Sequence, residues 1–238
     1  MNMKEFSRSN VEALSRFKQE PTWMRDLRLE AWDAFIQLGK KECADLALET
    51  LHAFIEPPQT AVPAHQWPLD LQHALDERGD EEGLIIQRDC TVLSRSISKE
   101  QAKRGVIFTD LDGAIKMVPE IVRNHFSRLA KPTTPLTALH TAFWSGGTFL
   151  YVPAHVEVRL PFHTCYWMST PKAAIFAHTV IIAEKGSRVS LIGEFLSRDW
   201  TERALSCAAA EMTVGRKVAV ALFDPNNQAD AAVLAVWT

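Results

Sequence analysis

The sequence predicts a mainly β protein that is preceded by an α-helical part. Up to Leu136 the apolar residues recur at helical spacing, whereas from there on they alternate with polar residues or form short runs. Turn residues such as Gly, Pro, Asn and Asp separate these runs, as expected for short strands. The expected strands are residues 149–152, 156–160, 163–168, 175–183, 189–193, 208–214, 218–223 and 231–237.

The change of period falls in residues 137–153, TALHTAFWSGGTFLYVP. This stretch combines an apolar approach, the turn signal Ser145-Gly146-Gly147 and a strand that ends before Pro153, which cannot donate a hydrogen bond to a sheet. We therefore expect a tight corner at Gly146-Gly147 and the first strand of the β body directly after it.

The spacing of the strands does not separate a sandwich, a cupin-like barrel and a solenoid. One repeat favours the solenoid, because a strand, a glycine-bearing turn and a second strand occur in residues 179–195 and again in 210–223, roughly 30 residues later. We divide the chain into an N-terminal helical region (1–56), a linker and short hairpin (57–104), a strand with capping helices (105–136) and the β body (137–238).

The N-terminal elements follow from capping and periodicity. Residues 9–12, Ser-Asn-Val-Glu, have the form of a capping box for a helix that runs to about Gln19. After Pro21, apolar residues at helical spacing predict an amphipathic helix to about Leu38, and residues 40–55 can continue as helix. Residues 56–65, EPPQTAVPAH, read as a linker.

The next elements lead into the β body. Residues 84–86 and 91–93 predict a hairpin around a polar turn, and residues 105–108 predict a short buried strand. Thr109 to Asp112 caps a helix, which Pro119 restarts and which ends at the breaker run 131–135.

Composition excludes several classes of protein. The formal net charge is -3, and Lys and Arg do not form runs, so nucleic acid is not an expected partner. No run of about 18 apolar residues occurs, and the first ten residues are polar, so neither a membrane span nor a secretion signal is expected. We expect a cytoplasmic protein. The cysteines Cys43, Cys90, Cys165 and Cys207 lack CxxC spacing and are expected to be reduced.

Histidines and cysteines in the β body are the candidate site residues, namely His140, His155, His163, His178, Cys165 and Cys207. No His-x-His pair occurs, so structural or surface roles are favoured over a metal site for the histidines. Because neither cysteine has an adjacent cation in the sequence, both are expected to be packed thiols rather than reactive ones.

No catalytic motif is found. Gly146-Gly147 lacks the Lys-Ser/Thr of a phosphate loop, no nucleophile elbow occurs, and Ser145 reads as a turn residue. The carboxylates expected along the strands, Glu157, Glu194 and Glu211, are far apart in sequence, which disfavours a carbohydrate-active β-helix enzyme. A group of aromatic residues is expected to form the core: Trp144, Phe149, Tyr151, Phe162, Tyr166 and Trp167.

Three ordered blocks carry a family resemblance: GVIFTDLDGAIKMVPEIVRNHF, TALHTAFWSGGTFLYVPAHVEVRLPF and FAHTVIIAEKGSRVSLIGEF. Upstream, EPTWMRDLRLEAWDAF and IIQRDCTVLSRSIS support them. Together they resemble the SufB/SufD family of iron-sulfur cluster assembly proteins over most of residues 20–238. The wording GVIFTD and WSGGTFLYVP is more SufD-like, and Glu194 stands where the SufB branch has a cysteine. A carboxylate cannot carry persulfide sulfur, and Glu194 is expected at the surface.

The resemblance implies a right-handed parallel β-helix that acts as a non-catalytic scaffold subunit. It implies a SufB-like partner that pairs through the β-helix and no firmly bound cofactor, with an iron-sulfur cluster only transiently at the complex. Family members are generally longer, with a C-terminal part that contacts the SufC ATPase, so a SufC-like partner is in doubt and a homodimer is open. The alternative is a cupin-like metalloprotein that uses strand histidines such as His155 and His163.

Overall fold

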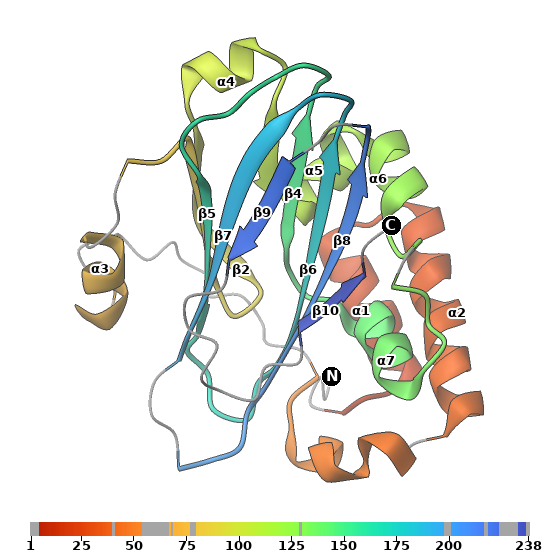
Figure 1. Ribbon diagram of the computed structural model, residues 1–238. Coiled ribbons are helices and arrows are strands. Elements are labelled where there is room, and N and C mark those ends of the chain that lie inside the picture. Colours follow the sequence, from red (N-terminus) through yellow and green to blue (C-terminus); the bar gives the residue numbers. More distant parts are fainter. Residues whose placement is uncertain are drawn as a thin grey trace.

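A computed structural model describes residues 5–39, 41–53, 67, 69–76, 80–128, 130–197, 201–216, 219–223 and 233–236. In this part of the chain two five-stranded sheets pack face to face, and the N-terminal helices cover the outer face of one of them (Figure 1). The expected linker over residues 56–65 lies outside the described residues.

The helical layer begins with α1 (Arg8–Lys18) and α2 (Thr22–Leu38). The Ser7 hydroxyl caps α1 by accepting from the amide of Asn10, so the capping box expected at residues 9–12 is wrong by two residues. The possible helix over residues 40–55 is also wrong within the described residues 41–53, which form the short 3-10 turns η1 (Lys41–Leu46) and η2 (Leu48–Thr50), separated by Ala47 in a left-handed conformation.

The remaining helices lie between and beside the strands. They are α3 (Leu69–Asp76), α4 (Lys99–Lys103), α5 (Leu111–Met117), α6 (Pro119–His125) and α7 (Pro135–Phe143). A capping box of Thr134 and Thr137 starts α7, which takes up residues expected to belong to the β body. The first strand after Gly146-Gly147 is β4 (Thr148–Val152), as expected.

The strands are β1 (Gly83–Arg88), β2 (Thr91–Ile97), β3 (Ile107–Asp110), β4 (Thr148–Val152), β5 (Phe162–Met168), β6 (Ala174–Ala183), β7 (Arg188–Ser197), β8 (Leu205–Val214), β9 (Ala219–Phe223) and β10 (Val233–Val236). One expected strand is wrong: residues 156–160 form a connection with a single bridge, Glu157 to Arg188. His155 has a positive φ, and Pro161 follows, so a regular strand does not fit between them.

From β4 onward the chain alternates between the two sheets, and each strand pairs in parallel with the strand two places further on. The sheet orders are β2-β1-β5-β7-β9 and β10-β8-β6-β4-β3. Thr179 pairs with Ala210 and Arg188 with Ala219, so the two repeated segments of the sequence lie side by side in register. Two pairs near the start are antiparallel, namely β1 with β2, which form the predicted hairpin, and β3 with β4, while β1 also pairs in parallel with β5.

Each layer has its own core. Between the sheets lie apolar side chains from both, namely Ile85, Val106, Phe108, Leu150, Val152, Phe162, Ile181, Val189, Leu191 and Met212. Between the helices and the sheet that contains β4, β6 and β8 lies a second core that includes Phe35, Phe143, Trp144 and Phe176. The predicted core aromatics Trp144, Phe149, Phe162, Tyr166 and Trp167 are buried, and Tyr151 is half-buried.

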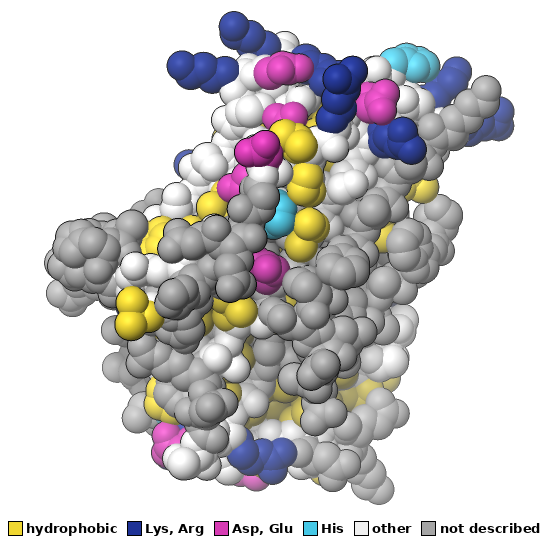
Figure 2. Space-filling model, turned by 60° about the vertical axis from the view of Figure 1, so that its left-hand side comes forward, with side chains coloured by type: hydrophobic (Ala, Val, Ile, Leu, Met, Phe, Trp, Pro, Cys, Tyr) yellow, Lys and Arg dark blue, Asp and Glu magenta, His cyan; other side chains and the backbone are white. Residues whose placement is uncertain are grey.

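Basic residues that are scattered in sequence gather at the end of the molecule that carries α4 (Figure 2). The connections after β4, β6 and β8 meet there, since His155 donates its amide to Lys185 and Gly186 donates its amide to Arg216. Exposed basic residues at this end are Lys99, Lys103, Arg104, Arg159, Lys185, Arg188 and Arg216, with Glu100, Glu157 and Glu184 among them. The connections between the strands thus bring together basic residues that lie far apart in the sequence.

Candidate functional site: a buried thiol, two histidines and a carboxylate

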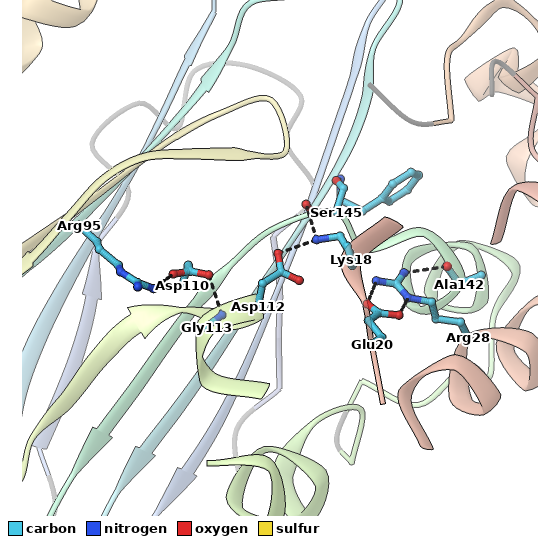
Figure 3. A network of polar contacts seen from close by, with 10 residues as sticks. Lys18, Glu20, Arg28, Arg95, Asp110, Asp112, Gly113, Ala142 and Ser145 are labelled. Atoms are coloured by element: carbon cyan, nitrogen blue, oxygen red, sulfur yellow. Dashed lines mark hydrogen bonds and ion pairs between the residues drawn. The ribbon is translucent and has the colours of Figure 1, made fainter. Parts of the chain in front are cut away.

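Ion pairs buried in the helical layer prepare the surroundings of the site (Figure 3). The Arg28 guanidinium donates from Nε and Nη2 to both carboxylate oxygens of Glu20 at 2.8 and 2.7 Å, and from Nη1 to the carbonyl of Ala142 in α7 at 2.9 Å. Both partners are almost fully buried, so α2 is fixed against α7 by charge-assisted hydrogen bonds.

The second ion pair joins α1 to α5, and its lysine also contacts the segment that precedes β4. Lys18 Nζ lies 2.6 Å from Asp112 and 3.2 Å from the carbonyl oxygen of Ser145. Lys18 Nζ and the Arg28 guanidinium carbon also lie 4.8 and 4.3 Å from the ring centroid of Trp144. The predicted core aromatic Trp144 therefore serves as a cation-π partner for two helices.

A chain of polar side chains crosses the interface between α7 and the sheet. Cys207 Sγ lies 3.7 Å from His140 Nδ1, His140 Nε2 lies 3.1 Å from His178 Nδ1, and His178 Nε2 lies 2.7 Å from Glu211 Oε1. His140 belongs to α7, His178 to β6, and Cys207 and Glu211 to β8. We call these four residues the Cys-His-His-Glu array.

The carboxylate at the end of the array also binds backbone. Glu211 Oε1 accepts from the amide of Ser127 at 2.5 Å, and Oε2 accepts from the amide of Ala130 at 3.2 Å. The ring of Phe126 stacks on His178 with 4.3 Å between centroids. The array therefore ties the segment between α6 and α7 to strands β6 and β8.

Local strand geometry explains why β6 and β8 bring these residues together. His178 pairs with Ala209, which lies midway between Cys207 and Glu211. Because side chains alternate along a strand, Cys207, Ala209 and Glu211 share one face of β8 and flank His178 on the neighbouring strand. That face of the sheet is the one covered by α7.

Burial decides the electrostatics of the array. The exposed fractions are 0% for His178, 2% for Glu211, 3% for His140 and 7% for Cys207. Burial above all, and then the electrostatic effects of His178 and Arg28, hold the pKa of His140 well below its ordinary value. Burial, with Cys43, raises the pKa of Cys207 to about 12. At neutral pH the thiol is therefore protonated and His140 is uncharged, so the array can share protons but offers no thiolate nucleophile.

The structure separates the other predicted residues from this array. His155 is exposed in a turn, and His163 and Cys165 are buried on β5 in the opposite sheet. Cys165 and Cys207 are both packed thiols, as predicted, but the contact of Cys207 with His140 was not predicted. The pairing of His140 with His178 was also missed, because it depends on α7 lying over β6.

The carboxylates Glu157, Glu194 and Glu211 do not converge. Glu157 is exposed and pairs with Arg188 at 3.4 Å, while Glu194 lies on β7 and Glu211 on β8, in different sheets. Glu194, which was expected at the surface, is partly exposed and pairs with Cys165 of the neighbouring strand. Among the described residues, no group of three or more His, Cys, Asp or Glu side chains has the geometry of a metal site.

Known proteins match both the sheet region and nearly the whole chain. Residues 85–163 match the family described as SufBD protein N-terminal region. These residues run from β1 through β5 and include α7 and the start of the alternation between sheets. The fold and this match define the class: a protein of two alternating sheets that carries a SufBD N-terminal region.

Individual relatives agree with this class. An iron-sulfur cluster assembly SufBD family protein of Pyrococcus horikoshii is 32% identical over 203 residues, which cover 79% of this chain and 45% of the relative. The iron-sulfur cluster assembly protein SufB of Bacillus subtilis is 26% identical over 86% of this chain and 47% of its own length, and a SufBD family protein of Staphylococcus haemolyticus is 26% identical over 92% and 50%.

The chain belongs to the SufB/SufD family. It spans about half the length of the curated relatives it matches. The matches include a protein named SufB, so they do not separate the SufD branch from the SufB branch. Within the described part of the chain, no helix has the length and apolar character needed to cross a bilayer.

Proposed function

We propose that this protein is a non-catalytic, SufD-like scaffold subunit of a SUF-type iron-sulfur cluster assembly complex. The observation that carries the proposal is membership of the SufB/SufD family together with an ordered run of parallel strands. The SufD-like assignment rests on the wording GVIFTD and WSGGTFLYVP and on Glu194 in place of the cysteine of the SufB branch.

The architecture that suits this role is a right-handed parallel β-helix. Support comes from the alternation of β4 to β10 between two sheets and from the parallel pairing of each strand with the strand two places on. Such a coil presents stacked rungs and their connections as an extended surface for a partner. The partner we propose is a SufB-like protein that pairs through the β-helix.

A non-catalytic role is supported by the protonated thiol of the Cys-His-His-Glu array. Cys207 is buried, and its pKa is raised to about 12, so it is a poor sulfur acceptor. We propose that an iron-sulfur cluster is held only transiently, at the assembled complex. The four cysteines are free thiols, which suits the reducing cytoplasm that we propose as its location.

Co-expression tests the proposal. The tagged chain is co-expressed with the SufB-like and SufC-like proteins of the same organism, and the eluted proteins are identified by mass spectrometry. We expect stoichiometric recovery of the SufB-like protein. Recovery of neither protein contradicts the proposal, and recovery of a second copy of this chain alone indicates a homodimer in place of the complex.

Two glycine variants test whether the association with the partner depends on the folded sheets. A Cβ at Gly147 would collide with backbone atoms of His178, whereas a Cβ at Gly193 would meet no atom within 4 Å. We therefore expect Gly147→Ala to lose the partner and Gly193→Ala to retain it. If Gly147→Ala keeps the partner, the association does not use the folded β body.

A further inference from the structure

The Cys-His-His-Glu array has one consistent arrangement of protons in its uncharged-histidine state. A carboxylate can only accept, so His178 Nε2 donates to Glu211. The other nitrogen of a neutral His178 must then accept from His140 Nε2, and His140 Nδ1 in turn accepts from the thiol of Cys207. All four side chains thus donate or accept in a single direction, from thiol to carboxylate.

We propose that the array is a proton-sensitive latch, which fastens Ser127, Ala130 and α7 onto β6 and β8 and which the uptake of one proton at His140 releases. The latch has contacts on both sides of the interface. Glu211 holds the amides of Ser127 and Ala130, and His140 carries α7. This inference does not depend on the proposed assembly function.

A proton added to His140 has no favourable place in the closed latch, whereas one added to His178 would pair with Glu211 and leave the latch closed. On His140 Nδ1 the proton removes the acceptor of the Cys207 thiol and creates a buried cation next to the Arg28 guanidinium, which already acts on His140. His140 is 3% exposed, so water cannot compensate for this charge. Opening the segment exposes His140 to solvent, where it can be protonated at its ordinary pKa.

The other charged groups around the array are already paired or face solvent. Arg28 is neutralised by Glu20, and Lys18 of α1 by Asp112 of α5. Further titratable groups on the surrounding elements are Cys43 in η1, His125 in α6, which contacts the carbonyl of Ile121, and the exposed Arg128 and Lys131. Arg128 and Lys131 are exposed to solvent, and His125 lies outside the array.

The direction of the pH effect follows from linkage. The folded state keeps His140 neutral, whereas the open state binds a proton below about pH 6.5, so the closed state is fully stable above that pH and loses stability as pH falls. One proton taken up only by the open state raises the open population by about tenfold between pH 7.5 and 5.5.

Hydrogen exchange monitored by mass spectrometry tests the latch in the full chain. In the wild type we expect the protection factors of amides in residues 127–143, corrected for intrinsic rates, to fall about tenfold between pH 7.5 and 5.5. Residues 83–97, which contain no histidine, are the internal reference and should keep their protection. An equal fall in both segments, or no fall in 127–143, overturns the proposal.

Variants separate the latch from a merely structural role. In His140→Phe the ring volume is kept but no proton can bind, so protection in 127–143 should be lower at pH 7.5 and should no longer depend on pH. His155→Asn removes an exposed histidine at a positive-φ position and should behave as the wild type. A pH dependence that survives in His140→Phe, or vanishes in His155→Asn, overturns the proposal. Should His140→Phe not fold, the wild-type comparison of the two segments still decides.

Discussion

The two interfaces of the molecule are built by different chemistry. The interface between the sheets holds aliphatic and aromatic side chains, with hydroxyl groups of Thr148, Thr164, Tyr166 and Thr179 hydrogen-bonded to one another toward one end. The interface between the helices and the sheet buries two cations, Lys18 and Arg28, together with the Cys-His-His-Glu array.

This difference teaches what each interface depends on. Apolar contacts are non-directional, so a substitution in the core between the sheets should lower stability in proportion to the side-chain volume that it removes. Buried charges and hydrogen bonds require a particular partner, so the helical interface is sensitive to the removal of one atom group and to protonation. The predictions below test this contrast, beginning with the close contact between Gly147 and β6.

Substitution of Gly147 should have the largest effect on the free energy of unfolding. Gly147 precedes β4, and a Cβ there would overlap the backbone of His178 in β6, which cannot move without breaking the sheet. We expect Gly147→Ala to lower the free energy of unfolding by more than about 4 kcal/mol. Urea unfolding followed by circular dichroism measures this, and Gly193→Ala, which meets open space, should change it by less than about 1 kcal/mol.

In the helical interface, Arg28→Leu should cost about 3 to 5 kcal/mol, because it leaves Glu20 buried without its cation. The matched control is Arg188→Leu, which breaks a pair with Glu157 whose side chains are 67% and 59% exposed, and it should cost no more than about 1 kcal/mol. Equal costs for the two variants would mean that the buried pair does not specify this interface.

In the core between the sheets, Leu150→Ala removes a fully buried side chain and should cost about 3 kcal/mol. Since no titratable group is involved, this cost should be the same at pH 7.5 and pH 6.0. Equilibrium unfolding at the two pH values checks this. A cost that changes with pH would contradict the expectation that the core between the sheets does not respond to protonation.

Tyr166→Phe should give the smallest effect. It removes the hydroxyl that contacts Thr148 at 2.8 Å and Thr179 at 3.3 Å, while Thr148 keeps its contact with Thr164 at 3.0 Å. We expect a loss of about 1 kcal/mol, measured by thermal unfolding. A loss as large as that of Leu150→Ala would show that the hydroxyl groups, and not apolar packing, dominate this core.

Much of the fold was predictable because strand period and turn residues are local signals. The hairpin of β1 and β2 was predicted, as were most of the strands from β4 onward, and the aromatic residues expected in the core are buried except Tyr151, which is half-buried. The errors have local causes as well. Residues 156–160 are apolar enough for a strand but lie between a turn at His155 and Pro161, and α7 begins at a Thr134 cap that was read only as part of a breaker run.

The candidate site was less predictable. Cys207 and Glu211 are four residues apart on one strand, and the repeat of roughly 30 residues would have placed His178 beside them. His140, however, comes from a helix, and no strand repeat indicates where a helix will lie. The role of Gly147 was likewise predicted as a tight corner, whereas its importance lies in the close approach of β6.

The sequence by itself therefore determined most of the helices and strands, the side-by-side pairing of the two repeated segments and the family, because these depend on residues close together or on a regular repeat. Only the tertiary structure decided which isolated polar residues meet. The sequence around a single histidine, thiol or carboxylate does not indicate its partner. The partners are set when α7 packs on the sheet and buries His140, His178, Cys207 and Glu211 against one another.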